Sequence, residues 1–367
     1  MGSFIAELRS GLAALAPTRF PYARFLAALI LGTAGGVLFY QAGLPLPWML
    51  GPMTACTLAA LLRAPISAPS VVRPPMSAVI GVMLGAAFSP DLLAQVATWT
   101  ISVLGLALFV VVCGLACVVY FRKVGGFDRT TAYFAGMPGG LVEMVIVGAE
   151  RGGDARTIAL VHSARILLVV MTLPFLVQWV EGVSLDARGA GGPSIMDVPL
   201  SAEIWILVCG LSGAFLGHLL KLPAKTLLGP MLVSAAVHVG GITDFVPPVE
   251  IVSAAQVVLG VTIGARFLGT APREILRILW LSVGSTIILL ALTLAFATAI
   301  GALMGLGTIP LILAYSPGGL AEMSLVAIAV QTEVAFVAAH HIIRIVFVMA
   351  GAGPVFALLR RFEREKE

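Results

Sequence analysis

Two similar groups of polar residues could carry chemistry in this otherwise apolar chain. In each group a Pro-Gly-Gly stands just before a glutamate, and a histidine and an arginine follow further along: Glu143, His162 and Arg165 in the first group, Glu322, His341 and Arg344 in the second. A carboxylate and an imidazole can exchange protons, and a guanidinium can bind an anion. The two groups therefore predict a duplicated chain whose two halves meet at one polar site.

The glutamates allow two interpretations. Pro-Gly-Gly breaks a helix, so we expect new half-helices to begin after Gly140 and Gly319, with Glu143 and Glu322 in their first turns. In the structural interpretation each carboxylate caps the free amides of its half-helix. In the functional interpretation each carboxylate lies at low dielectric and holds a proton or a cation. The two roles can coexist.

The arginines allow three interpretations. Arg165 and Arg344 lie near the start of the last apolar run of each half, where a buried guanidinium needs a partner. Each could pair with the glutamate of its own half, bind an anionic solute bidentately, or extend to the membrane interface. His162 and His341 precede them by about one helical turn. His340 is an additional imidazole that occurs only in the second group.

The composition predicts an all-α, polytopic membrane protein. Hydrophobic residues make up 59% of the chain and charged residues 11%, whereas soluble domains carry about 25% charged residues. The net charge of +4 is too small to indicate a nucleic-acid partner. The four cysteines lie in apolar segments without a matching ligand set, so we expect no metal, no other cofactor and no catalytic residue.

The sequence repeats itself at a spacing of 178 or 179 residues. Leu-Gly-Pro-Met recurs at 50–53 and 228–231, and Pro-Gly-Gly-Leu-x-Glu-Met recurs at 138–144 and 317–323. A constant spacing over much of the chain indicates a duplication. The glycines of a small-xxx-small pattern, at 81 and 85 and again at 260 and 264, predict close helix packing.

Each half contains five apolar runs that could cross a membrane, with 76–90 the shortest. They are 24–43, 46–62, 76–90, 96–121 and 157–179, then 202–220, 225–241, 250–268, 278–304 and 335–357. A sixth run in each half, at 129–150 and 308–330, holds the Pro-Gly-Gly. If the sixth run crosses, the halves are parallel. If it enters and leaves on one side, the halves are inverted.

The positive-inside rule favours the inverted arrangement. With re-entrant sixth runs and a cytoplasmic N-terminus, all of the 22 Lys and Arg residues are cytoplasmic except Arg188 outside and Arg165 and Arg344 in the membrane. We therefore predict two inverted repeats, each with five transmembrane helices and one re-entrant hairpin. Both termini would be cytoplasmic, in a bacterial inner membrane.

The predicted organisation has five parts. They are an interfacial amphipathic segment at 1–23, repeat 1 at 24–180, an external linker at 181–201, repeat 2 at 202–360 and a cytoplasmic tail at 361–367. Within the first part, residues 4–20 are expected to form a helix on the membrane surface. Each arm of a hairpin is about ten residues, or roughly 15 Å, so the two Pro-Gly-Gly tips should approach each other at mid-membrane.

The paired Pro-Gly-Gly-Leu-x-Glu-Met and Leu-Gly-Pro-Met elements resemble the AbrB duplication family of bacterial inner-membrane proteins. The resemblance extends from about Arg24 to Arg360. Members carry names such as "AbrB family regulator" and "ammonia monooxygenase", which imply gene regulation or an enzyme. The residues supply neither a DNA-binding domain nor a copper or iron cluster.

We expect a secondary transporter, not an enzyme, that moves a small anionic solute with protons by alternating access. The alternatives are a membrane-embedded sensor that regulates gene expression and, third, a membrane monooxygenase. The expected partners are the lipid bilayer, the solute, protons and a further copy of the chain. The predicted binding residues are Pro138, Gly139, Gly140, Glu143, His162, Arg165, Ser316, Pro317, Gly318, Gly319, Glu322, His341 and Arg344.

Overall fold

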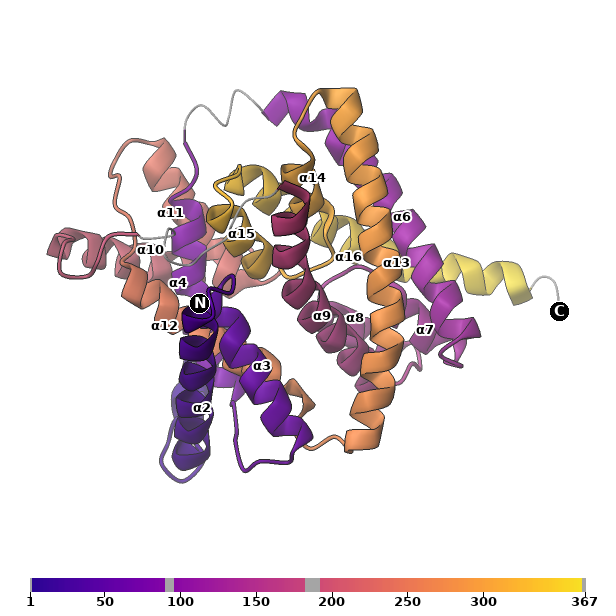
Figure 1. Ribbon diagram of the computed structural model, residues 1–367, viewed down its shortest axis with the longest axis horizontal. Helices are drawn as coiled ribbons and strands as arrows, with labels where there is room; N and C mark the ends of the chain where they lie inside the picture. Colours follow the sequence, from indigo (N-terminus) through magenta and orange to yellow (C-terminus); the bar gives the residue numbers. More distant parts are fainter. Residues whose placement is uncertain (1, 90–95, 182–191, 365–367) are drawn as a thin grey trace. The chain divides into compact units, whose positions relative to one another are not determined.

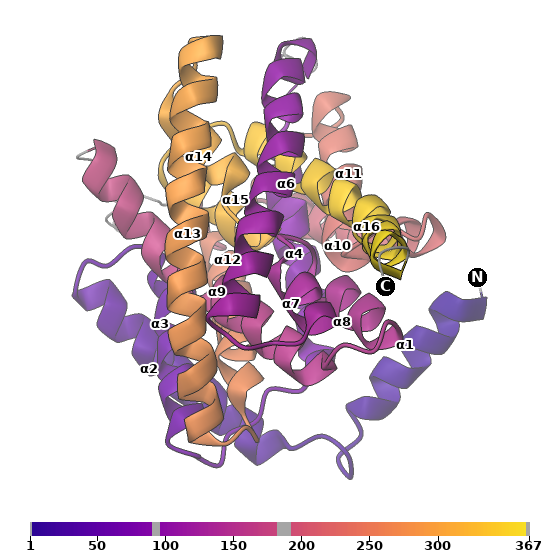
Figure 2. The same ribbon diagram turned by 90° about the vertical axis from the view of Figure 1, so that its right-hand side faces the viewer.

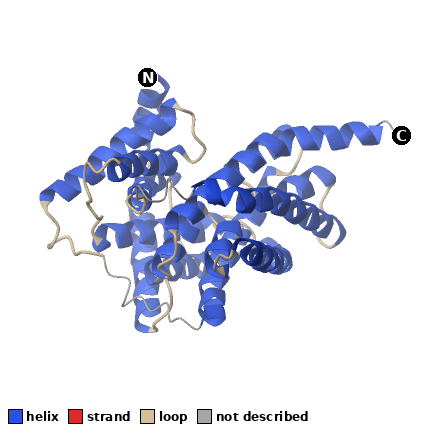
Figure 3. Cartoon of the chain, turned by 90° about the horizontal axis from the view of Figure 1, so that it is seen from above, coloured by secondary structure: helices blue, strands red, loops and turns tan. Residues whose placement is uncertain are grey.

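The computed structural model describes residues 2–89, 96–181 and 192–364, and within these ranges all regular secondary structure is helical (Figures 1 and 3). Seven of the described helices are long and apolar enough to cross a membrane. They are α2 (Tyr22–Gln41), α6 (Thr100–Lys123), α9 (Ala155–Glu181), α10 (Leu200–Leu219), α12 (Val249–Gly264, continued by a 3-10 turn), α13 (Pro272–Met304) and α16 (Val334–Arg364). The chain is thus a multi-pass membrane protein, and the predicted all-α, polytopic class is confirmed, whereas the inverted repeats stay a prediction.

The remaining described α-helices are shorter. They are α1 (Gly2–Ala14), α3 (Pro47–Leu61), α4 (Arg73–Gly85), α7 (Arg129–Gly136), α8 (Leu141–Glu150), α11 (Lys225–Val239), α14 (Thr308–Tyr315) and α15 (Leu320–Ala329). Every predicted apolar run contains a helix. However, α3, α4 and α11 have 15, 13 and 15 residues, fewer than the roughly 20 that a perpendicular crossing needs. Ten crossings therefore stay a prediction.

Four predicted segments extend beyond the described residues. They are the segment 1–23 at residue 1, the run 76–90 at residue 90, the linker 181–201 at 182–191 and the tail 361–367 at 365–367. At the N-terminus, α1 ends at Ala14, earlier than the predicted end at residue 20, because Pro17 disfavours helix in the residue before it. The face of α1 that carries Leu8 and Leu12 is exposed, as in an amphipathic helix.

The helices form two compact units, and each unit contains helices from both halves of the sequence. Unit 1 covers 1–95, 174–270 and 324–335, and unit 2 covers 96–173, 271–323 and 336–367. Unit 1 includes α2, α3 and α4 of the first half with α10, α11 and α12 of the second. Unit 2 includes α6 to α8 and most of α9, with α13, α14 and most of α16.

Glycines let the helices of unit 1 pack with their backbones in contact. A Cβ at Gly81 or Gly85 of α4 would overlap carbonyl oxygens of α11, those of Leu227 and Met231. A Cβ at Gly260 or Gly264 of α12 would overlap the carbonyl oxygens of Met49 and Met53 on α3. The close approach predicted from the small-xxx-small pattern is confirmed. In both pairs, the two helices come from different halves of the chain.

The backbone repeats its unusual conformations at the spacing of the sequence repeat. Leu46 and Ala224, directly before α3 and α11, both have φ of 44°, which is left-handed and rare for residues with a side chain. Gly126 after α6 has φ of 67°, and Gly305 after α13 has φ of 66°. Equivalent positions of the two halves therefore adopt the same local structure.

In unit 2, α6 and α13 run side by side and support the two broken helices (Figure 2). Gly105 of α6 faces Ile300, and Gly284 of α13 faces the Tyr120 side chain. Helix α7 packs on α6, and α14 packs on α13. The Pro-Gly-Gly segments are thereby placed next to long, apolar helices.

Candidate functional site

Both Pro-Gly-Gly runs form two short helices separated by an extended break, as predicted. Helices α7 and α8 have 8 and 10 residues, and so do α14 and α15. The break begins at Met137, with φ −66° and ψ 132°, and at the equivalent Ser316, with φ −55° and ψ 131°. Both breaks lie in unit 2.

Hydrogen bonds close the first hairpin at its base. The Asp128 carboxylate accepts from the Thr131 amide at the start of α7. The Thr131 hydroxyl oxygen in turn accepts from the amide of Asp154, which follows α8, at 2.9 Å. The segment therefore begins and ends at the same place, which a re-entrant hairpin requires. The side of the membrane from which it enters stays a prediction.

Two buried arginines hold the carbonyl groups of the breaks. Arg165 of α9 donates to the carbonyl oxygens of Met137 at 2.9 Å and Gly139 at 3.2 Å. Arg344 of α16 donates in the same way to Ser316 and Gly318, the equivalent residues of the second half. A helix break leaves carbonyls without partners, which is costly away from water. The planar guanidinium satisfies two of them at once.

These contacts argue against two of the three interpretations of the arginines, and anion binding stays a prediction. Each arginine is only 4% exposed, so neither extends to an interface. No ion pair among the described residues joins Arg165 or Arg344 to a carboxylate. The contact with tip carbonyls was not predicted. The one signal for it was that the arginine recurs together with the Pro-Gly-Gly.

The glutamates fold back over the start of their own half-helices. The carboxylate of Glu143 lies against Gly140 and that of Glu322 lies against Gly319, so that a Cβ at either glycine would overlap it. This is where a capping carboxylate belongs, and a negative charge there is favoured by the helix dipole. Glu322 is 5% exposed, whereas Glu143 is partly exposed. Proton carriage by either glutamate stays a prediction.

The histidines do not share one role. His162 Nε2 lies 2.9 Å from the Phe134 carbonyl oxygen of α7, so it binds the first hairpin. His341 Nδ1 lies 2.9 Å from the Val337 carbonyl oxygen of its own helix. The additional His340 is 2.8 Å from the Ser102 hydroxyl of α6. The equivalent histidines therefore bind different groups.

Both tips lie against α6. The charges of Arg165 and Arg344 are close enough to act on each other, and both act on Cys113 of α6. Met137 of the first tip packs against Gly114. At the second tip the Tyr315 ring meets Phe109 edge to face, 5.2 Å between centroids, and its hydroxyl donates to the Ser102 carbonyl oxygen. Both tips therefore contact the same helix of unit 2, and their approach to each other at mid-membrane stays a prediction.

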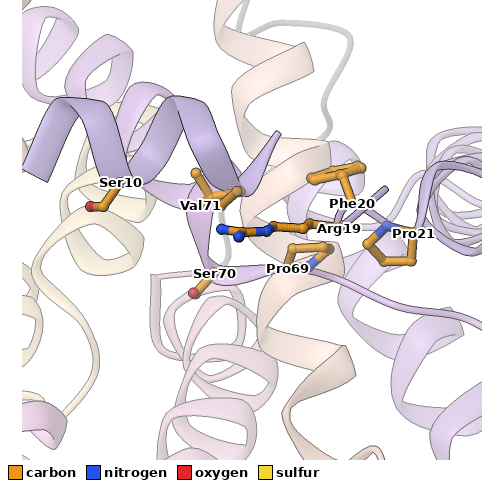
Figure 4. A pocket seen from close by; sticks show the side chains of 8 residues that line it. Ser10, Arg19, Phe20, Pro21, Pro69, Ser70 and Val71 are labelled. Atoms are coloured by element: carbon orange, nitrogen blue, oxygen red, sulfur yellow. The ribbon is translucent and has the colours of Figure 1, made fainter. Parts of the chain in front are cut away.

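A separate pocket lies in unit 1, at the end of α1. It has a volume of about 250 Å³, and the Arg19 side chain lies across it between Phe20 and the segment 69–71 (Figure 4). None of the predicted site residues lines it. The pocket is therefore independent of the arginine-bound tips.

Comparison with known proteins identifies the family. The profile described as "Transition state regulatory protein AbrB" matches residues 48–360. The YhjN protein of Bacillus subtilis (strain 168) is 30% identical over 362 residues, covering 92% of this chain and 94% of the relative. A protein of Escherichia coli (strain K12) named as a regulator, AbrB, is 25% identical over 320 residues, covering 87% of this chain and 91% of the relative. The chain belongs to the AbrB family.

Proposed function

We propose that this protein is a secondary transporter, not an enzyme, which moves a small anionic solute together with protons by alternating access. The observation that carries the proposal is the pair of broken helices whose tips are held by buried arginines in one compact unit. Non-helical backbone at membrane depth is tolerated where protein buries it or where it lines a cavity. Paired breaks in the two halves of a duplicated chain point to a transporter's binding site.

In this proposal the repeats are inverted, and the two hairpins enter from opposite sides. The charge distribution of the loops supports the inversion, and the recurrence of the same turns at the repeat spacing supports the duplication. The protein would lie in a bacterial inner membrane with both termini in the cytoplasm. Its two hairpin tips would form the part of the solute pathway that each side reaches in turn.

The glutamates are the proposed proton carriers. Each lies in the first turn of a half-helix, next to a tip. Protonation of a buried carboxylate removes its charge, so the loaded and unloaded tips differ in electrostatics. Such a difference can bias a conformational equilibrium only if the two states bind the proton unequally.

Transport by the glutamate variants tests the proposal. Proteoliposomes containing a pH-sensitive dye would be challenged with small carboxylates and inorganic oxyanions under an imposed pH gradient. We expect solute-dependent proton entry in the wild type and its loss in Glu143→Gln and Glu322→Gln, with size-exclusion profiles unchanged. Glu150→Gln, at the exposed end of α8, is the matched control and should transport normally. Normal coupled transport in both tip variants would sink the mechanism.

A membrane-embedded sensor is the second candidate, because the Escherichia coli relative is named as a regulator. A sensor would bind its ligand at the same tips without moving it. Specific binding with no counterflow between loaded vesicles and medium selects this reading. Counterflow selects the transporter.

A further inference from the structure

Hydrogen-bond donors remain unused at the arginine-bound tips. The Nε atoms of Arg165 and Arg344 and the hydroxyl of Ser316 are buried and have no hydrogen-bond partner. The two side chains of arginine are 4% exposed and Ser316 is fully buried. Leaving such groups unsatisfied costs about 1–3 kcal/mol each, more when they are charged. Three groups of this kind on the two tips of unit 2 indicate a site built for a ligand that accepts hydrogen bonds.

The charges at the tips point to an anion. Arg165 and Arg344 act on each other as like charges, and no carboxylate of the described residues pairs with either. The glutamates lie instead against Gly140 and Gly319 at the helix starts. Two buried cations without a counter-charge repel each other and lose hydration. An anion that contacts both would offset both penalties.

We infer that Arg165 and Arg344 together bind one small anion that carries two negative charges on oxygen. A monoanion would neutralise the charge of one guanidinium and leave the other without a counter-charge. Each Nε–H donates to the ligand while the terminal nitrogens of the same guanidinium keep the tip carbonyls. The inference rests on the proposed function in one respect, since it takes the two tips as the binding site of the solute. It then names the chemical class of that solute, a small dianion.

The second tip contributes the neutral donor. The Ser316 hydroxyl has no equivalent in the first half, where Met137 occupies the position. His341 is close by, but its Nδ1 faces the Val337 carbonyl oxygen and must carry the proton there. The ring also meets the Ser316 backbone, so His341 is not counted among the ligand's donors. Ser316 therefore orients the ligand toward the second half.

Binding to the solubilised full-length protein tests this inference without any need for transport. Malonate and succinate would be compared with sulfate and hydrogenphosphate, and with acetate as the monoanion, by calorimetry and by the ligand-induced rise in Tm. We expect saturable binding of dianions, with acetate at least about tenfold weaker. Tighter binding of malonate or succinate would show that the site prefers two charges on separate carboxylates. Tighter binding of sulfate or hydrogenphosphate would show that it prefers both charges on one oxyanion.

Three variants sharpen the test. Ser316→Ala keeps the backbone carbonyl that Arg344 holds and should weaken dianion binding about tenfold, as one lost hydrogen bond to a charged group predicts. Arg165→Lys and Arg344→Lys keep the charge, lose Nε and should abolish saturable binding. Arg151→Lys is the matched control, because Arg151 also donates to a backbone carbonyl, that of Gly353, and should bind as the wild type does.

Equal affinity for acetate and malonate would overturn the inference. So would wild-type dianion affinity in both Ser316→Ala and a folded arginine variant. Absence of saturable binding by any of the dianions would also overturn it. Should the arginine variants fail to fold, Ser316→Ala alone decides. Tight dianion binding in a protein that transports nothing would support this inference and contradict the proposed transporter function. Coupled transport without dianion binding would support the transporter function and contradict this inference.

Discussion

At the scale of single residues, the buried arginines have a structural task before any functional one. Each guanidinium satisfies two carbonyls that the helix break leaves open. An unsatisfied polar group in an apolar environment costs several kcal/mol, so removal of Arg165 or Arg344 should impair folding first. Functional tests therefore have more to gain from Ser316, Glu143 and Glu322, whose side chains do not hold the breaks.

Asp154 gives a pH-dependent prediction at the same scale. Its carboxylate accepts from the Thr157 hydroxyl and the Arg156 amide at the start of α9, and the Thr157 hydrogen bond is the main reason that its pKa lies below the usual value. Because the folded-state pKa is the lower one, the stabilisation is complete above an unfolded pKa of about 3.9 and is lost as pH falls through the folded value.

Replacing Asp154 by Ala should cost about 1 kcal/mol at neutral pH through loss of the helix cap, and little at a pH below the folded pKa. Asp154→Asn keeps an acceptor for the Thr157 hydroxyl and should flatten the pH dependence. Thermal unfolding of the three proteins in detergent between neutral and acidic pH measures both effects. An equal cost of Asp154→Ala at both ends of the range would contradict the prediction.

The sequence predicted which residues form the candidate site better than it predicted their contacts. Glu143, Arg165 and their counterparts recur with the Pro-Gly-Gly, and that recurrence was enough to group them. It did not show that Arg165 binds carbonyls of Met137 and Gly139, because backbone acceptors have no signature in residue type. Nor did it show that equivalent histidines bind different groups.

At the scale of helices, small residues decide which faces can touch. Gly213 of α10 lies against the backbone of Pro230 in α11, whereas Gly210 in the same helix has open space at its Cβ position. Gly213 of α10 and Gly229-Pro230 of α11 thus form a backbone contact that a side chain at position 213 would prevent. The breaks after Met137 and Ser316 were predictable from Pro-Gly-Gly, but the shortness of α3, α4 and α11 was not, since their flanking turns are also apolar.

The pair Gly213→Ala and Gly210→Ala tests this contact within one helix. Gly213→Ala forces backbone atoms apart and should lower stability by about 3 kcal/mol or more. Gly210→Ala meets nothing and should raise stability by up to about 1 kcal/mol through helix propensity. Size-exclusion profiles after heating report the loss of folded protein. Similar Tm values for the two variants would show that the helices can separate at little cost.

At the scale of the whole molecule, the two compact units do not coincide with the two halves of the sequence. The repeat spacing showed that the halves resemble each other, but a repeat does not specify which helices pack together. In the structure, α3 packs on α12 and α11 packs on α4, across the halves. The segment boundaries predicted from the sequence describe the repeats, and the packing does not test them.

The predicted inversion requires α9 to cross the membrane, and labelling tests this. Single cysteines replacing Glu150 and Met196 stand at exposed positions on either side of α9, and the four native cysteines are buried. A membrane-impermeant maleimide should label Glu150→Cys only in inside-out vesicles and Met196→Cys only in right-side-out vesicles. Labelling of both from one side would exclude the inverted topology.

The two glycine contacts of unit 1 are the same contact made twice. Gly81 meets Leu227 as Gly260 meets Met49, with the roles of the halves exchanged. Such reciprocity is the mark of an isologous interface between identical subunits. A half-length ancestor would have needed a second copy to cover its glycine face, at a concentration high enough to associate. Joining two such copies in one chain makes that association intramolecular, which leaves each half free to change alone.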